Sequence, residues 1–172
     1  SNTSADLLNE KSRIRITNYH LRGLQFDGNK CISESDCIWV EENYTALNEL
    51  GKDSLFQNGM NALSNYRWHL QPRIRLAIIW AGIEGLFKID SELSFRLSLY
   101  AAKLLYPNDA ALRKAKFEKV KKLYRQRSLA VHGAEIKGDS KTFVEESANL
   151  LRDILKKCVE NKSFPLAEDL AP

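Results

Sequence analysis

The sequence predicts an all-α protein, a bundle of about five or six helices. Apolar residues recur at spacings of three and four over most of the chain, and glycine, proline and helix-capping residues separate these periodic segments. With 172 residues, 44% of them hydrophobic and 28% charged, the chain has the size and composition of one globular domain. We expect the helical domain over residues 36–165, after an N-terminal arm at 1–35 and before a tail at 166–172.

The N-terminal arm differs from the rest of the chain. The stretch RIRIT alternates polar and apolar residues, and FDGNK carries a turn signal, so the arm is predicted to be extended or to form a short β-hairpin. The sequence starts with Ser1 and not with methionine, which leaves open an upstream domain of a longer protein.

Two amphipathic helices are expected after the arm. The first begins at Ser35 or Asp36 and breaks at Gly51, and the second follows Asp53 and closes before Pro72. Their periodic apolar residues are expected to face the core. In the first helix these residues are Ile38, Val40, Tyr44, Leu47 and Leu50, and in the second they are Leu55, Phe56, Met60, Leu63, Tyr66 and Leu70.

The third helix is expected to occupy the centre of the bundle. Its sequence, RIRLAIIWAGIEGLFK at 73–88, is apolar almost all round, which is typical of a helix buried on most faces. A fourth helix should begin after a cap at Asp90 or Ser91 and break at Pro107.

The fifth helix is expected from Asn108 or Asp109 to Gly133, and the sixth from about Lys141 to Glu160. Spacings of three and four define one inward seam along the fifth helix. The seam consists of Phe117, Val120, Tyr124, Arg127 and Val131. An arginine therefore occupies a position where an apolar residue is expected.

Arg127 and Glu84 are predicted to form an ion pair. Moving an uncompensated guanidinium out of water costs several kcal/mol, so an inward arginine needs a partner. Glu84 is the only charged residue between Leu76 and Phe87 in the apolar third helix, and it needs a cation for the same reason. The alternatives are an arginine that reaches past the core edge to solvent and a glutamate on a narrow exposed stripe.

His132 follows Arg127 near the end of the fifth helix, in the stretch LYRQRSLAVHGAE. Five residues correspond to about 140° on an ideal helix, so the two side chains do not share one face of a regular helix. A histidine in this position can also act simply as a favourable residue at the helix C-terminus.

The fifth helix is strongly basic. Between Arg113 and Arg127 there are eight basic residues and one acidic residue. Such a strip suits a polyphosphate backbone, although a solvated lysine-rich face is the alternative. The outward residues that we assign to nucleic-acid binding are Lys114, Lys121, Lys122 and Arg125.

Cysteine usage and hydropathy narrow the class of protein. The three cysteines, Cys31, Cys37 and Cys158, form no CxxC pair, which favours reduced thiols and a cytoplasmic location. A zinc site made of Cys31, Cys37 and His20 matches no standard ligand spacing, so no metal or cofactor is expected. No apolar run reaches the ~20 residues of a membrane span, and residues 1–20 lack a secretory signal pattern.

The helices that carry Glu84 and Arg127 resemble the Apea-like branch of the HEPN superfamily over roughly residues 36–161. The resemblance rests on the stretch IWAGIEGLF, followed after one helix by KLYRQRSLAVHG, in which an arginine and a histidine are separated by four residues at a helix end. It implies that Arg127 and His132 are the catalytic motif pair and that Glu84, Ser128 and Tyr124 support them. Ser128 departs from the Asn, Asp or His that is frequent after the motif arginine.

The resemblance implies a metal-independent endoribonuclease in which the 2′-hydroxyl of RNA attacks the adjacent phosphate, with a role as a toxin or in bacterial defence. It also implies a homodimer that brings two motifs together through the motif helix, and RNA as the partner. Two other readings stay open. One is a non-catalytic HEPN module that binds RNA or nucleotide, or that dimerises for an upstream domain or partner protein; the other is a scaffold with a buried Arg127–Glu84 pair.

Overall fold

The chain folds into six α-helices and one short 3-10 helix in a computed structural model that describes residues 32–89, 91–135 and 138–165. No strand occurs in these ranges, so the all-α prediction is confirmed. The predicted hairpin arm before residue 32 and the tail from residue 166 lie outside the described residues. The elements are α1 (Glu34–Leu50), α2 (Ser54–Asn65), η3 (Tyr66–Trp68), α3 (Pro72–Phe87), α4 (Leu93–Leu105), α5 (Ala110–Val131) and α6 (Ser140–Asn161).

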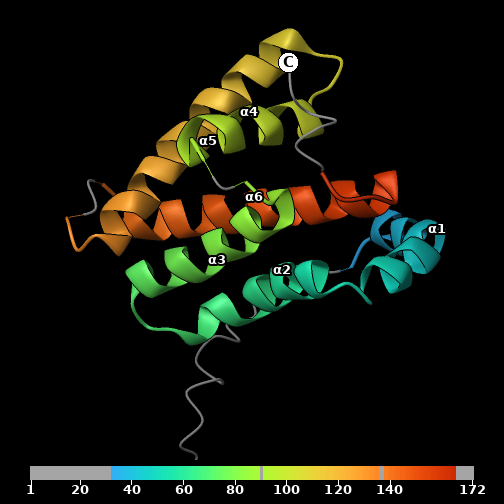
Figure 1. Ribbon diagram of the computed structural model, residues 1–172. Coiled ribbons are helices and arrows are strands. Elements are labelled where there is room, and N and C mark those ends of the chain that lie inside the picture. The colour runs from blue at the N-terminus through green and yellow to red at the C-terminus, as the bar shows by residue number, and fades with distance from the viewer. Residues whose placement is uncertain (1–31, 90, 136–137, 166–172) are drawn as a thin grey trace, which may run out of the picture.

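The core lies around α3 and α6, which run side by side through the middle of the bundle (Figure 1). Helix α2 packs on one side of α3, and the α4–α5 hairpin packs on the other. Leu76, Ile79, Trp80 and Ile83 on α3 are fully buried, which confirms that the apolar third helix is central. Helices α2 and α3 approach closely at Gly82, where a Cβ atom would lie 2.8 Å from that of Ala62.

Side-chain caps set most of the helix starts. Asp53 and Asp109 cap α2 and α5 as predicted, and Asp139 caps α6. Helix α1 begins at Glu34, just before the predicted start at Ser35 or Asp36, because Ser33 and Asp36 form a reciprocal capping box. The predicted cap of α4 is wrong: the residue before α4 is Glu92, with a left-handed φ of 49° and no side-chain cap bond.

The predicted inward face of α1 is also wrong in part. Ile38, Val40 and Tyr44 are exposed, Tyr44 by 59%. Helix α1 lies at the edge of the bundle and packs mainly on α6, so it buries only a narrow face. That face includes Trp39, whose indole N–H donates to Glu160 on α6 over 3.1 Å. On the second segment, Met60 and Leu70 are likewise exposed, against the prediction.

Cys158 is a core residue, since it is fully buried and burial raises the pKa of its thiol to about 12. Cys37 is exposed, whereas Cys31 and His20, the other members of the disfavoured zinc site, lie outside the described residues. Within the described ranges, no helix combines the length and apolar character that crossing a membrane requires.

Candidate functional site

The end of α5 determines where the histidine of the motif lies. His132 is the C-cap, and its N–H still bonds to the carbonyl of Ser128 at 3.0 Å. Gly133 follows with φ +78°, and the N–H of Ala134 then donates back to Leu129 over 3.0 Å. These features are those of a Schellman turn, in which glycine takes the left-handed position at low cost. The turn leaves His132 exposed just beyond the helix.

Arg127 points the other way and forms the predicted pair with Glu84. The arginine Nη2 donates to Glu84 Oε2 over 3.0 Å, which joins α5 to α3. The two side chains are only 20% and 21% exposed. A charge-assisted bond between mostly buried groups is stronger than a surface ion pair, because little solvent screens it. The pair therefore ties the motif helix α5 to α3.

Aromatic rings continue this contact into the core. The guanidinium of Arg127 lies 5.5 Å from the ring centroid of Tyr124. Tyr124 meets Trp80 of α3 edge to face, with 5.3 Å between the ring centroids. Trp80 donates its indole N–H to the hydroxyl of Ser147 on α6 over 3.1 Å. Tyr124 thus packs against Arg127 on α5 and connects it through Trp80 to α3 and α6.

The Arg127–Glu84 pair makes only one of its two possible hydrogen bonds. Arg127 Nε and Glu84 Oε1 are both buried and have no hydrogen-bond partner among the described residues. A forked arginine–carboxylate pair would use these two atoms for its second bond. Buried polar atoms without partners cost stability, so the missing second bond lowers what the pair contributes to the free energy of unfolding.

Burial also governs the protonation of the groups around Arg127. The pKa of the Glu84 carboxyl is raised because burial disfavours the ionised form, while Arg127 lowers it in part. The pKa of the Tyr124 hydroxyl is raised by burial and next by the charge of Glu84, with Arg127 acting in the opposite direction. The ionised form of Glu84 therefore depends on the neighbouring Arg127 charge.

The inward face of α5 differs from the predicted seam in its second half. Val120 is buried as predicted, but Val131 is 49% exposed. The buried residues there are instead Leu123, Gln126 and Ala130. The seam turns because α5 packs first on α4 and then between α3 and α6, so the contacted face rotates along the helix.

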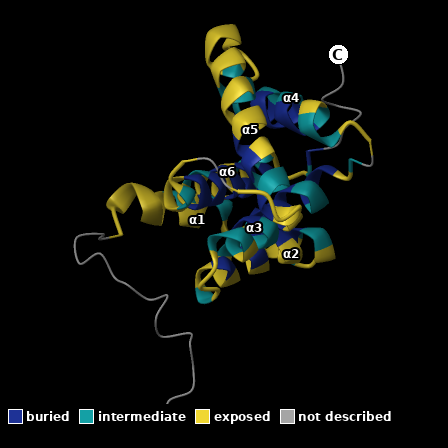
Figure 2. Cartoon of the chain, turned by 90° about the vertical axis from the view of Figure 1, so that its left-hand side faces the viewer, coloured by how far each residue is buried: buried dark blue, intermediate teal, exposed yellow. Residues whose placement is uncertain are grey.

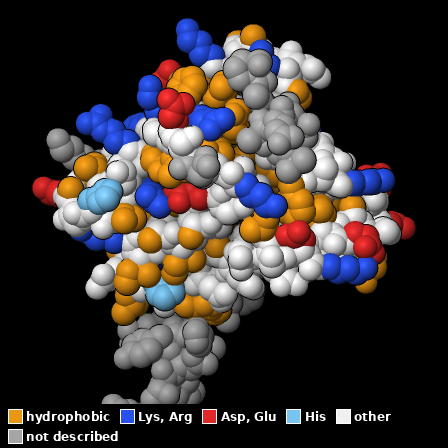
Figure 3. Space-filling model, viewed as in Figure 1, with side chains coloured by type: hydrophobic (Ala, Val, Ile, Leu, Met, Phe, Trp, Pro, Cys, Tyr) orange, Lys and Arg blue, Asp and Glu red, His pale blue; other side chains and the backbone are white. Residues whose placement is uncertain are grey.

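The basic residues of α5 fall into two groups, one that meets α6 and one that faces solvent. Lys and Arg side chains gather over α5 in Figure 3. Lys116 and Lys119 pair with carboxylates of α6, at 3.6 Å from Asp153 and 2.8 Å from Glu146. Lys122 leans toward the same side, with its Nζ 6.0 Å from the centroid of Phe143 on α6.

The second group faces solvent. Lys114, Lys121 and Arg125 are exposed, and no carboxylate lies within salt-bridge distance of them in the described part of the chain. On an ideal helix these three residues and His132 fall within about 40° of one another. The structure therefore places three of the four predicted RNA-binding residues in line with the motif histidine, and Lys122 on the adjoining face.

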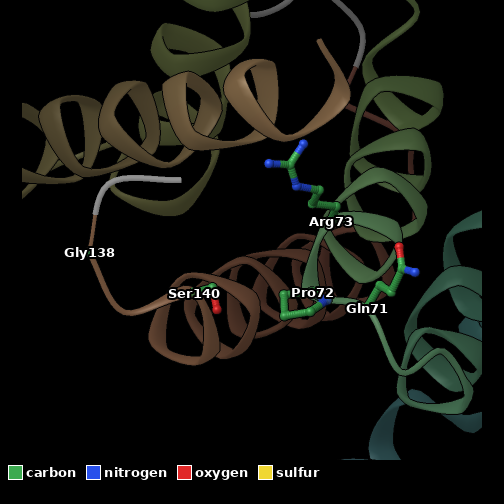
Figure 4. A pocket seen from close by; sticks show the side chains of 5 residues that line it. All are labelled: Gln71, Pro72, Arg73, Gly138 and Ser140. Carbon is green, nitrogen blue, oxygen red and sulfur yellow. The ribbon is translucent and has the colours of Figure 1, made fainter. Parts of the chain in front are cut away.

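Arg73 is a residue near the motif that the sequence did not single out. Its guanidinium donates from the start of α3 to the carbonyl of Ala134 over 2.8 Å, and so holds the segment after the Schellman turn. Figure 4 shows Arg73 at a pocket of about 320 Å³, with Gln71, Pro72, Gly138 and Ser140. None of the predicted site residues is among these five. A basic residue beside a helix-starting proline is too common to carry a sequence signal.

Comparison of the chain with protein-family models, with curated proteins and with solved structures gives no match.

The coupling of Arg127 and Glu84 predicts a pH-dependent stability. The folded chain holds the Glu84 proton more tightly than the unfolded chain does, so the free energy of unfolding should fall as pH rises from the ordinary value of 4.5 through the raised pKa. Arg127→Ala removes the cation that opposes this shift. We expect that variant to lose roughly 1–3 kcal/mol near neutral pH and to recover part of it on acidification, as measured by urea unfolding.

Two variants control this experiment. Arg125→Ala removes an exposed arginine nearby in the same helix and should change stability by less than about 0.5 kcal/mol at every pH. Adding Glu84→Gln to Arg127→Ala should abolish the recovery in acid. A loss in Arg127→Ala that is the same at all pH values would contradict the coupling.

Proposed function

We propose that the chain is a HEPN-type endoribonuclease that cleaves RNA without a metal ion, at a site completed by a second copy of the chain. The observation that carries the proposal is the end of α5. A mostly buried Arg127 is held there by Glu84, and an exposed His132 follows five residues later in line with a set of basic side chains without salt-bridge partners. The resemblance of IWAGIEGLF and KLYRQRSLAVHG to the Apea-like branch supports the same reading.

The side chains suit the chemistry of RNA cleavage. The 2′-hydroxyl must lose a proton as it attacks the phosphate, and the leaving 5′-oxygen must gain one. His132 is accessible and can carry either proton. Arg127, which stays charged, can stabilise the negative charge that develops on the phosphate oxygens. Lys114, Lys121 and Arg125 supply the charge that attracts and aligns the backbone.

A second copy of the chain supplies what one motif lacks. Arg127 is directed at α3 and His132 at solvent, and no hydrogen bond joins them in the described residues. Large apolar side chains are exposed near this end of the bundle, in the two segments that Arg73 connects. They are Leu70, Ile74 and Val131. Such residues favour a symmetric contact in which each histidine approaches the arginine of the other chain.

A non-catalytic RNA-binding module is the second candidate. Arg127 is mostly buried and engaged by Glu84, and Ser128, whose side chain is only partly exposed, stands where the family often has Asn, Asp or His. Both features would leave the basic face able to bind RNA without a competent catalytic group. Binding without cleavage in the next experiment would favour this candidate.

Cleavage of mixed RNA in the presence of EDTA tests the enzyme directly. His132→Ala removes the proposed proton carrier and should lower the rate by about a hundredfold or more. His69→Ala is the matched control, because His69 is also exposed but lies outside α5, and it should cleave at the wild-type rate. Equal rates in the two variants would exclude His132 from the reaction.

Mixed dimers test the shared site. If arginine and histidine come from different chains, a heterodimer of Arg127→Ala and His132→Ala keeps one intact site and loses the other. Random exchange of subunits should then restore about a quarter of the wild-type rate. Mixing Arg127→Ala with the double variant restores no site and is the control. Cleavage by a protein that remains monomeric at assay concentration would contradict the shared site.

The salt dependence of RNA binding tests the basic face. Lys121→Gln with Arg125→Gln should reduce the slope of log affinity against log salt by about one to two, since two phosphate contacts are lost. Lys116→Gln with Lys119→Gln removes the same charge from the two lysines that pair with carboxylates of α6 and should change the slope less. Equal slopes in the two double variants would assign the effect to net charge alone.

A further inference from the structure

An exposed aromatic pair lies beside the first half of α5, well before the motif. Phe95 of α4 is 53% exposed, although it is a large apolar side chain. Its ring meets Phe117 of α5 edge to face, with 5.7 Å between centroids and 76° between planes. The Nζ of Lys121 lies 5.7 Å from the centroid of Phe117. An accessible ring and an unpaired lysine therefore occur together.

The aromatic pair is aligned with the motif. The residues Lys114, Phe117, Lys121, Arg125, Ser128 and His132 follow one another at spacings of three and four. On an ideal helix they fall within about 80°, so they form one stripe along α5. In Figure 2 the first turns of α5 stand out from the body and are largely exposed, which leaves this end of the stripe open to a ligand.

We propose that Phe95, with Phe117 beneath it, is a base-stacking subsite for single-stranded RNA, and that the stripe carries the strand from there to His132. This inference rests on the proposed function. Alternation of aromatic and basic side chains is the pattern that holds single strands, because the rings accept base faces while the cations follow the phosphates. Paired bases in an RNA duplex do not offer their faces, so the subsite selects unpaired RNA.

The stripe also fixes the distance between the stacking subsite and the motif histidine. Phe117 and His132 are fifteen residues apart, or about 22 Å at ~1.5 Å per residue. Nucleotides stacked at ~3.4 Å cover this length with about six residues of RNA. A strand that keeps this stacked spacing therefore needs about six nucleotides or more to occupy the stacking subsite and the motif together.

A binding experiment separates stacking from charge. The probes are 2′-O-methyl RNA strands of about twelve nucleotides, which cannot be cleaved by 2′-hydroxyl attack, and abasic strands with the same phosphates. Phe95→Leu should weaken binding of the strand with bases about tenfold and leave abasic binding unchanged, because only bases stack. Phe95→Trp, which keeps an aromatic face, should retain wild-type binding.

Tyr44→Leu is the matched control, because Tyr44 is an equally exposed aromatic residue on the distant helix α1 and should have no effect. Binding that is unaltered in Phe95→Leu, or equally weakened for both kinds of strand, would overturn the subsite and leave the proposed function standing. Phe95-dependent displacement of RNA by an acidic peptide would also overturn it, in favour of a protein partner. A chain that neither binds nor cleaves any RNA would instead refute the proposed function itself.

Discussion

The pairing of Arg127 with Glu84 is the constraint on which the arrangement of this end of the bundle depends. A guanidinium on the inward side of α5 needs a compensating charge, and the only carboxylate in the interior of α3 provides it over 3.0 Å. The contact fixes how α5 is rotated relative to α3. Tyr124 and Trp80 then meet edge to face, and Trp80 reaches Ser147 on α6. The ion pair and these aromatic contacts together join the three central helices.

The same rotation determines which basic residues of α5 remain accessible to solvent. With Arg127 directed at α3, Lys116 and Lys119 meet α6 and pair with Asp153 and Glu146. The opposite side of α5 is left to solvent with Lys114, Lys121 and Arg125, and the Schellman turn adds His132 to that side. Packing of the core thus separates the cations of one helix into structural and accessible sets.

The sequence predicted the helices and the ion pair, because both follow from local rules. The periodicity of the apolar residues predicted all six helices. A single charged residue in each of two apolar helix faces was enough to predict that Arg127 pairs with Glu84. The predictions that were wrong concern side chains whose burial depends on tertiary contacts. Val131 and Tyr44 fit a helical seam, yet both are exposed, because α5 changes packing partners along its length and α1 lies at the bundle edge. Nothing local distinguishes Lys121 from Lys119, since the carboxylate that pairs with Lys119 is on another helix.

The incomplete bonding of the pair bears on the choice between scaffold and site. A buried ion pair adds little stability over apolar residues of the same volume, and unbonded Nε and Oε1 atoms reduce it further. Glu84 orients Arg127 through one bond, and the guanidinium carries its charge regardless of its partner. Under the proposed function, the pair serves more to position the motif arginine on the helix that ends at His132 than to stabilise the fold.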